Sequence, residues 1–268
     1  MALPPPTIDT TVLVTGASAG IGSELARELA RRSYNVVLVA RRAERLRELA
    51  EELRLTHGIH ADIEPCDLAD AAERRELIAR LDAGEREVVG VCNNAGLGTV
   101  APLVEAGVER EQQVVRLNVE ALHHLTGAFL PRMVADGAGA ILNVASIAAF
   151  QPLPGFATYA ASKAFVQSFS EAVHAELGGT GVSVTCLCPG FTHTEFGENA
   201  GAGEQEAMLP EFLFMEAPDV ARIGIEAMVV GRRTAIPGLA NRASMFGGRM
   251  APRSILLPLV RQATGRRR

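Results

Sequence analysis

The chain has 268 residues, 48% of them hydrophobic, which is enough to bury the core of one large domain or two small ones. A formal net charge of −5 gives no global reason to expect nucleic acid as a partner. No apolar run is long enough to cross a bilayer, and the start MALPPPTIDT lacks the charged and apolar regions of a secretory signal. We therefore expect a cytoplasmic protein.

Short apolar runs rich in valine and isoleucine alternate with longer stretches of helical period. The runs predicted as strands are residues 11–15, 35–40, 59–66, 88–93, 140–146, 182–188 and 234–237. The stretches predicted as helices are residues 24–32, 43–54, 71–81, 109–130, 157–177 and 217–230. This alternation predicts one α/β domain over residues 11–237, a doubly wound (Rossmann) parallel sheet of about seven strands in three α/β/α layers. Residues 1–10 are expected to form a flexible tail, and residues 238–268 an extension.

The first predicted turn between a strand and a helix reads TGASAGIG. Its glycines, Gly16, Gly20 and Gly22, would let the backbone approach a pyrophosphate while the helix N-terminus supplies amide donors. The letters from Gly16 to Gly20 also match the G-x-S-x-G turn of hydrolases, with Ser18 as nucleophile. Such a turn follows several strands and needs an upstream loop, whereas only ten residues precede the first strand here. Dinucleotide binding is therefore favoured over a serine hydrolase.

The end of the second predicted strand carries a cofactor-preference signal. Ala40 stands where an NAD-binding fold would place an acid for the ribose 2′-hydroxyl, and Arg41 and Arg42 follow it directly. A guanidinium can bind a 2′-phosphate through paired hydrogen bonds and stack on adenine. The alternative is that these arginines only open a solvated helix. The missing acid favours NADP(H).

Further motifs follow in order along the chain. They are CDL at Cys66 to Leu68, NNAG at Asn93 to Gly96, NVAS ending at Ser146, the Tyr-x-x-x-Lys pair Tyr159 and Lys163, and CPGFTHT at Cys188 to Thr194. With TGASAGIG these motifs resemble those of the short-chain dehydrogenases/reductases, from Thr11 to about Pro237. The resemblance implies a homo-oligomer, dimer or tetramer, that acts on a small carbonyl or alcohol substrate.

The resemblance also assigns site residues. The cofactor-binding residues it implies are Gly16, Ser18, Gly20, Ile21, Gly22, Arg41, Arg42, Asp67, Leu68, Asn94, Ala95, Gly96, Tyr159, Lys163, Pro189, Gly190, Thr192 and Thr194. The catalytic residues it implies are Asn118, Ser146, Tyr159 and Lys163. In the family the serine hydrogen-bonds the substrate oxygen, and the asparagine holds a water that links the lysine to solvent. Taken in isolation, Ser146 could instead form a local turn and Asn118 a buried amide bonded to backbone.

Lys163 is the only lysine in a chain with 26 lysines and arginines in total. Residues four apart on a helix share a face, so its ammonium would lie beside the Tyr159 phenol and favour the ionised phenol. That phenol ordinarily titrates near pH ~10 and would be a poor base at neutrality. In the family the lysine also binds the nicotinamide ribose, a role that suits a compact ammonium better than a forked guanidinium.

The substrate is expected to contact a loop over about residues 191–216, whose glycines would permit closure. Its apolar side chains, Phe196, Met208, Leu209, Phe212, Phe214 and Met215, suggest an apolar ketone, although they could equally anchor the loop to the core. A noncatalytic NADP-binding regulator would keep the same cofactor site. It would have no need for the serine, tyrosine and lysine set, which therefore favours an enzyme.

No metal site is expected. The cysteines, Cys66, Cys92, Cys186 and Cys188, lack C-x-x-C spacing and lie in or beside apolar runs, so we interpret them as buried reduced thiols. His123, His124 and His174 have helical spacing and no assigned partner, and we interpret them as structural.

The end of the chain is strongly basic. Residues 227–268 contain nine arginines and no acidic residue, with apolar pieces between the arginines. Such a segment is suited to peripheral contact with an anionic membrane. The alternative is that it packs across the acidic body or a neighbouring subunit and covers the substrate cleft.

Overall fold

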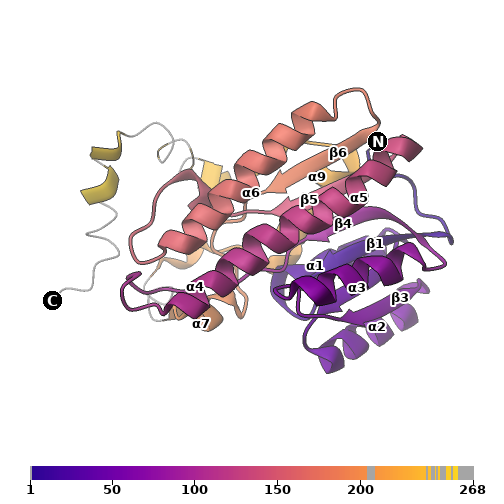
Figure 1. The fold of residues 1–268 in the computed structure, drawn as a ribbon, viewed down its shortest axis with the longest axis horizontal. Coiled ribbons are helices and arrows are strands. Elements are labelled where there is room, and N and C mark those ends of the chain that lie inside the picture. The colour runs from indigo at the N-terminus through magenta and orange to yellow at the C-terminus, as the bar shows by residue number, and fades with distance from the viewer. Residues whose placement is uncertain are drawn as a thin grey trace.

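A computed structural model of the chain describes residues 2–203, 209–239, 241–242, 245, 247, 252–254 and 256–258. The strands are β1 (Thr10–Thr15), β2 (Asn35–Ala40), β3 (Ala61–Pro65), β4 (Glu87–Asn93), β5 (Gly139–Val144), β6 (Val182–Leu187) and β7 (Thr234–Ala235). They form one parallel sheet in the order β3-β2-β1-β4-β5-β6-β7 (Figure 1). The predicted seven-stranded doubly wound sheet is confirmed.

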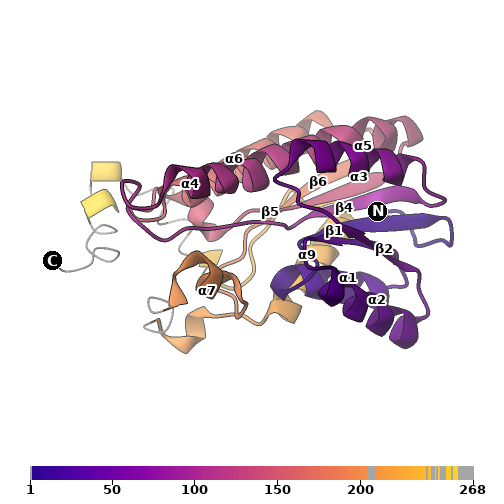
Figure 2. The same cartoon turned by 60° about the horizontal axis from the view of Figure 1, so that its bottom comes forward.

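Helices cover both faces of the sheet. The principal ones are α1 (Gly20–Arg31), α2 (Ala43–His57), α3 (Ala71–Asp82), α4 (Val108–Val115), α5 (Leu122–Asp136), α6 (Ala157–Glu176) and α9 (Ala217–Val230). Figure 2 shows α3, α5 and α6 on one face and α1 and α2 on the other. The core divides in the same way. Leu25, Leu46 and Met228 belong to one buried cluster, and Leu77 and Leu125 belong to another.

The sheet order positions the site. From β1 the chain runs outward to β2 and β3, then returns to β4 on the other side of β1. Parallel sheets bind ligands where the strand order reverses, at the carboxyl ends of the strands. The turns that follow β1 and β4 therefore flank the expected crevice, and they carry the TGASAGIG and NNAG motifs.

The N-terminal segment packs against the domain, which differs from the expected flexible tail over residues 1–10. Leu3 is fully buried in the core, in a space that Gly90 leaves open because a Cβ there would lie 2.9 Å from Leu3 Cδ1. The Ala2 amide donates to the Val229 carbonyl at 3.0 Å, and the Tyr34 hydroxyl donates to the Pro4 carbonyl at 2.8 Å. One apolar side chain and these hydrogen bonds hold a segment that shows no periodic pattern.

The helix predicted over residues 109–130 is interrupted. A π-helical turn at Arg116–Ala121 (η1) separates α4 from α5, and α5 continues to Asp136, where Gly137 ends it in the left-handed conformation. Extra residues in a π turn change which side chains face inward, and such turns are frequent at functional sites. The turn contains Asn118, one of the expected catalytic residues.

The described helices include none that is both long and apolar enough to span a membrane. The expected lipid-binding extension, residues 238–268, lies largely outside the described residues. Near its start, Asn241 is buried and donates from Nδ2 to the Pro237 carbonyl at 2.7 Å. The extension therefore begins against the body of the domain.

Candidate active site

The glycine-rich turn after β1 has the geometry that a pyrophosphate requires. Gly16 has a φ of 66°, and a Cβ at Gly22 would overlap the Gly16 carbonyl oxygen. The residue before α1 is Ala19, so no side chain caps the helix. The first-turn amides, which have no partner within the helix, can therefore bind an anion. Ile21, also in this turn, packs partly against the core.

Thr15 links this turn to the NNAG segment. Its Oγ1 donates to the Cys92 carbonyl at 3.2 Å and accepts from the amides of Asn94 and Ala95 at 2.9 and 3.0 Å. The Asn94 side chain donates in turn to the Thr15 carbonyl at 3.0 Å. These bonds hold Asn94 and Ala95 so close to Gly16 that a Cβ there would lie 2.9 Å from the Ala95 Cα. The motifs do not single out Thr15, because its role is visible only once the two turns meet.

Arg41 and Arg42 follow β2 and form the predicted binding site for the 2′-phosphate, here called the phosphate corner. There Arg42 contacts Ser18. Arg42 donates to Ser18 Oγ from Nη2 at 3.0 Å and from Nε at 3.1 Å. Within the described residues, this hydroxyl has no histidine partner that could act as a general base. The general base that a serine hydrolase would need beside Ser18 is therefore missing from the described residues. Arg41 is exposed, and its guanidinium makes no ion pair with the described part of the chain.

The CDL segment follows β3. Leu68 is buried, and Asp67 Oδ1 accepts a hydrogen bond from the Ala69 amide at 3.0 Å, forming a tight local turn. Because β3 lies beside β2, the segment comes after the strand that neighbours the one ending at Ala40. Asp67 and Leu68 are thus placed at the same edge of the sheet as Arg41 and Arg42.

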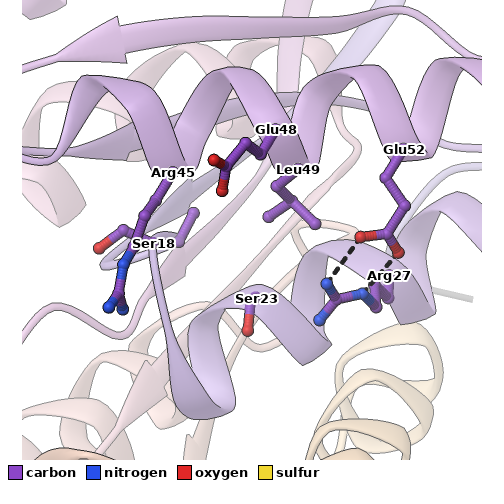
Figure 3. A pocket seen from close by; sticks show the side chains of 8 residues that line it. Ser18, Ser23, Arg27, Arg45, Glu48, Leu49 and Glu52 are labelled. Atoms are coloured by element: carbon purple, nitrogen blue, oxygen red, sulfur yellow. Dashed lines mark hydrogen bonds and ion pairs between the residues drawn. The ribbon is translucent and has the colours of Figure 1, made fainter.

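A cavity of about 220 Å³ opens beside Ser18, between α1 and α2 (Figure 3). Its lining residues are Ala17, Ser18, Ser23, Arg27, Arg45, Glu48, Leu49 and Glu52. Arg27 donates to both carboxylate oxygens of Glu52, each at 2.7 Å, so these charges are already paired. Tyr159 and Lys163 do not line this cavity, which is therefore distinct from the expected reaction site.

Tyr159 and Lys163 lie together on α6, as their spacing predicts. Both are buried, with 8% and 5% of their surface exposed, and Lys163 Nζ lies 5.8 Å from the centre of the Tyr159 ring. The ammonium donates to the Val144 carbonyl at 2.8 Å. Burial lowers the pKa of Lys163 to about 8, against a smaller opposing effect of the nearby Cys186 and Cys188. The site thus holds a buried cation that changes charge near neutral pH.

Asn118 is almost fully buried and bonded at both ends of its amide. Its Oδ1 accepts from the Leu97 amide at 2.8 Å, and its Nδ2 donates to the Leu97 carbonyl at 2.9 Å and to Ser162 Oγ at 3.0 Å. A Cβ on Gly96 would lie 3.4 Å from Asn118 Oδ1 and 3.5 Å from Lys163 Nζ. Asn118 and Lys163 therefore approach the same glycine, which keeps the space between them open.

Ser146 stands at the end of β5 and caps a short 3-10 turn, η2 (Ile147–Phe150). Its Oγ accepts a hydrogen bond from the Ala148 amide at 3.1 Å. This is the local turn that was the alternative to a catalytic role for Ser146. The Ile147 amide donates to the Pro189 carbonyl at 2.9 Å, and η2 packs against α6. The serine segment is thus held between the tyrosine helix and the proline-glycine turn.

The proline-glycine turn reaches the glycine-rich turn. Thr194 lies so close to Gly20 that a Cβ there would stand 3.0 Å from Thr194 Cγ2. Thr192 Oγ1 donates to the Gly190 carbonyl at 3.1 Å, and Gly190 packs against Asn241 without room for a side chain. The CPGFTHT segment therefore runs beside the turn that begins α1.

Aromatic rings surround Tyr159. Phe156 stacks on it with ring centres 4.4 Å apart, and Phe196, which begins the short helix α7 (Phe196–Ala200), lies 5.4 Å away. Phe156 was missed because a lone aromatic before a helix carries no motif. Other loop residues lie elsewhere, since Phe212 is 78% exposed and Phe214 stacks on His193. Met215 packs against the core, Leu209 is half-buried, and Met208 lies outside the described residues.

Histidine and cysteine have structural positions. His174 Nδ1 lies 2.9 Å from the Val184 carbonyl, His123 packs on Phe169, and Arg74 Nε donates weakly to His124 at 3.5 Å. All four cysteines are buried and free. Among the described residues no three acidic, histidine or cysteine side chains gather in a way that would hold a metal ion.

Comparison with known proteins gives one family. A model described as short chain dehydrogenase matches residues 10–207. Sulfoacetaldehyde reductase 2 from Chromohalobacter salexigens is 37% identical over 79% of this chain and 85% of its own length. A short-chain dehydrogenase from Sphingobium yanoikuyae, solved with NADPH, is 35% identical and superposes with a TM-score of 0.80 over 95% of this chain and 97% of its own.

A second solved structure is similar over the whole length. The bulky-bulky ketone specific alcohol dehydrogenase from Comamonas testosteroni is 30% identical, with a TM-score of 0.76 over 98% of this chain and 96% of its own. The family model covers well over half of the sequence, and the glycine-rich, NNAG and proline-glycine turns that suggested the family contact one another. The chain belongs to the short-chain dehydrogenase/reductase family.

Proposed function

We propose that this protein is an NADP(H)-dependent oxidoreductase that interconverts a ketone or aldehyde and an alcohol by hydride transfer. The observation that carries the proposal is the buried Tyr159 and Lys163 pair on α6, next to Gly96 and the turns that meet at Gly16. The relatives described above are named as dehydrogenases and reductases that act on alcohol and carbonyl groups. Bound nicotinamide would supply the hydride.

The residues present fit a dinucleotide phosphate. Gly16, Gly20 and Gly22 leave a cradle that any Cβ would fill, and the uncapped start of α1 offers amides to the pyrophosphate. Arg41 and Arg42 would hold the 2′-phosphate with Ser18. The Sphingobium yanoikuyae relative was solved with NADPH, and a serine dehydrogenase that is 33% identical was solved with NADP+. Both relatives support NADP(H) as the cofactor of this chain.

Tyr159 is proposed as the general acid in reduction and the base in oxidation. Its proton would pass to the alkoxide that forms at the substrate oxygen, which Ser146 would stabilise with a hydrogen bond. The Lys163 ammonium lies on the same helix face and would favour the ionised phenol. Because Lys163 approaches Gly96, it would also reach ribose hydroxyls there.

Asn118 is proposed to hold the π turn and Leu97 in place beside Lys163. Both ends of the Asn118 amide are bonded within the protein. Asn118 would therefore support a proton path by fixing the Leu97 carbonyl and the Ser162 hydroxyl around a water. The buried bond to Ser162 supports this arrangement, since Ser162 is the residue next to Lys163.

The substrate is proposed to be an apolar ketone. Phe156 and Phe196 pack against the Tyr159 ring, and an apolar surface there would bind an aryl or alkyl group better than a charged one. The Comamonas testosteroni relative acts on bulky ketones, whereas the Chromohalobacter salexigens relative is named for sulfoacetaldehyde, an anionic aldehyde.

A direct test is a substrate panel with NADPH, followed at the nicotinamide absorbance band. The panel pairs bulky aryl alkyl ketones with small anionic aldehydes at equal concentration. We expect higher kcat/KM for the bulky ketones. Turnover of the anionic aldehydes alone would contradict the apolar substrate, and no turnover of any carbonyl would contradict the reductase.

Assembly and location are part of the same proposal. We propose a cytoplasmic location and a homo-oligomer. The oligomer is supported by exposed apolar side chains on neighbouring helices, Val115 on α4 and Phe165 on α6. The basic residues 238–268 would make peripheral contact with anionic lipid. Light scattering tests the first point. Cosedimentation with anionic vesicles at low and at ~150 mM salt, with and without residues 238–268, tests the second.

A further inference from the structure

One carboxylate, that of Glu195, forms ion pairs with arginines at the predicted phosphate corner. Glu195 lies just before α7, about 150 residues from α2 in sequence, and its two oxygens are held by two different arginines. Arg42 Nη1 donates to Oε2 at 2.9 Å, and Arg45 Nη1 donates to Oε1 at 2.6 Å. The two arginines lower the pKa of Glu195, so the carboxylate is ionised at neutral pH.

Arg42 joins this clamp to Ser18. While Nη1 holds Glu195, Nη2 and Nε of the same guanidinium donate to Ser18 Oγ. Arg45 extends toward the same serine, as Figure 3 shows. Two guanidinium groups therefore hold one carboxylate just after β2, where the NAD-type acid is missing at Ala40, and one of them is also bonded to the Ser18 hydroxyl.

This donor set suits a phosphate monoester better than a carboxylate. Guanidinium forks match both groups geometrically, but a phosphate monoester carries about −1.5 to −2 charge and three acceptor oxygens at neutral pH. A carboxylate carries one charge and two oxygens. A 2′-phosphate that reached Arg42 and Arg45 would thus displace Glu195, which can turn into solvent because 42% of its side chain is exposed.

We propose that Glu195 is an internal competitor for the 2′-phosphate of NADP(H) and that Arg45 is a further ligand of that phosphate. The proposal rests on NADP(H) being the cofactor. Binding of NADPH would require Glu195 to leave both arginines, whereas NADH, which lacks the phosphate, would leave the clamp intact. Glu195 therefore reduces the preference for NADPH over NADH, and Arg45 increases it.

The size of the effect follows from exposure. The two ion pairs are more than 40% exposed on both sides, and exposed pairs contribute little individually. Removing the competitor should therefore tighten NADPH binding by roughly two- to tenfold. Arg45 bound to a phosphate makes a charge-assisted contact, so its loss should weaken NADPH binding by roughly tenfold or more.

The test is the dissociation constant of NADPH and of NADH for the full chain, measured by calorimetry at ~50 mM salt. Glu195→Gln should bind NADPH about two- to tenfold more tightly and NADH within about twofold of wild type. Glu198→Gln is the matched control. It removes the same charge three residues further along, in the first turn of α7, and Glu198 forms no ion pair with the described residues. It should leave both constants unchanged.

A second pair of variants tests Arg45. In the Glu195→Gln background, Arg45→Ala should weaken NADPH by roughly tenfold or more and leave NADH unchanged. If Glu195→Gln binds NADPH as wild type does or more weakly, Glu195 does not compete with the 2′-phosphate. If Arg45→Ala weakens NADPH and NADH equally, Arg45 is not a ligand of that phosphate. A wild-type chain that binds no NADPH would instead refute the proposed function, so the two failures are distinguishable.

Discussion

Replacing Lys163 with methionine should change how stability depends on pH. Burial lowers the pKa of Lys163 from 10.5 to about 8, so above pH 8 the folded protein releases a proton that the unfolded chain keeps up to about pH 10.5. Since the unfolded state binds more protons in this window, the free energy of unfolding rises with pH there. At 1.36 kcal/mol per pH unit the gain is on the order of 3 kcal/mol. Below pH 8 the lysine is protonated in both states and contributes no slope.

The assay is urea unfolding of wild type and Lys163→Met without cofactor, from pH 7 to pH ~10.5. Groups remote from Lys163 titrate equally in both proteins and cancel in the difference, and Lys163 is the only lysine. Repeating the comparison with Tyr159→Phe in both proteins removes the neighbouring phenol, whose pKa Lys163 would also change. We expect the stability of wild type relative to the variant to stay level up to pH 8 and then rise by roughly 3 kcal/mol. A difference that stays level across pH 8 to ~10.5, or falls, would refute the buried cation. A single ¹³C-lysine resonance titrating near pH 8 would give the same answer directly.

Three further predictions concern the packing of the N-terminus, the glycine-rich turn and the substrate site. Leu3→Ala should lower the free energy of unfolding by about 2–5 kcal/mol in urea unfolding, because the side chain is fully buried. A loss below about 1 kcal/mol would mean that the N-terminal segment is a loose tail. Gly22→Ala should be strongly destabilised or insoluble because its Cβ overlaps a carbonyl, while Gly127→Ala, with open space around it, should gain up to about 1 kcal/mol in urea unfolding. Phe196→Ala should raise KM for bulky ketones several-fold and leave the melting temperature within a few degrees of wild type. Equal KM values for variant and wild type would mean that the Phe196 ring does not contact the substrate.

The sheet and its helices were predictable because their patterns are local. The alternating runs gave all seven strands, and six helical stretches gave the layers. Leu3 escaped because its burial depends on the space left by Gly90, 87 residues away in sequence. The π turn around Asn118 also escaped, because it changes the helical period over a single turn, which is too short a stretch for a periodic pattern to reveal.

The site shows the same division. Residues that belong to contiguous motifs, such as Gly16 and the pair Tyr159 and Lys163, could be named from the sequence. Contacts between motifs could not be predicted. Thr15 stands in the TGASAGIG motif, but its bonds to the NNAG segment depend on how the two turns meet. Glu195 lies outside the motifs and bonds to arginines about 150 positions earlier.

The measurement that tests the central claim most directly is NADPH oxidation with the best ketone of the panel, comparing wild type with Tyr159→Phe. The account predicts turnover by wild type and a loss of at least about a hundredfold in kcat for the variant, because only the hydroxyl that would donate the proton is removed. The variant should still bind NADPH with nearly wild-type affinity in calorimetry. Retention of most of the activity by Tyr159→Phe, or tight NADPH binding by a wild type that turns over no carbonyl, would contradict it.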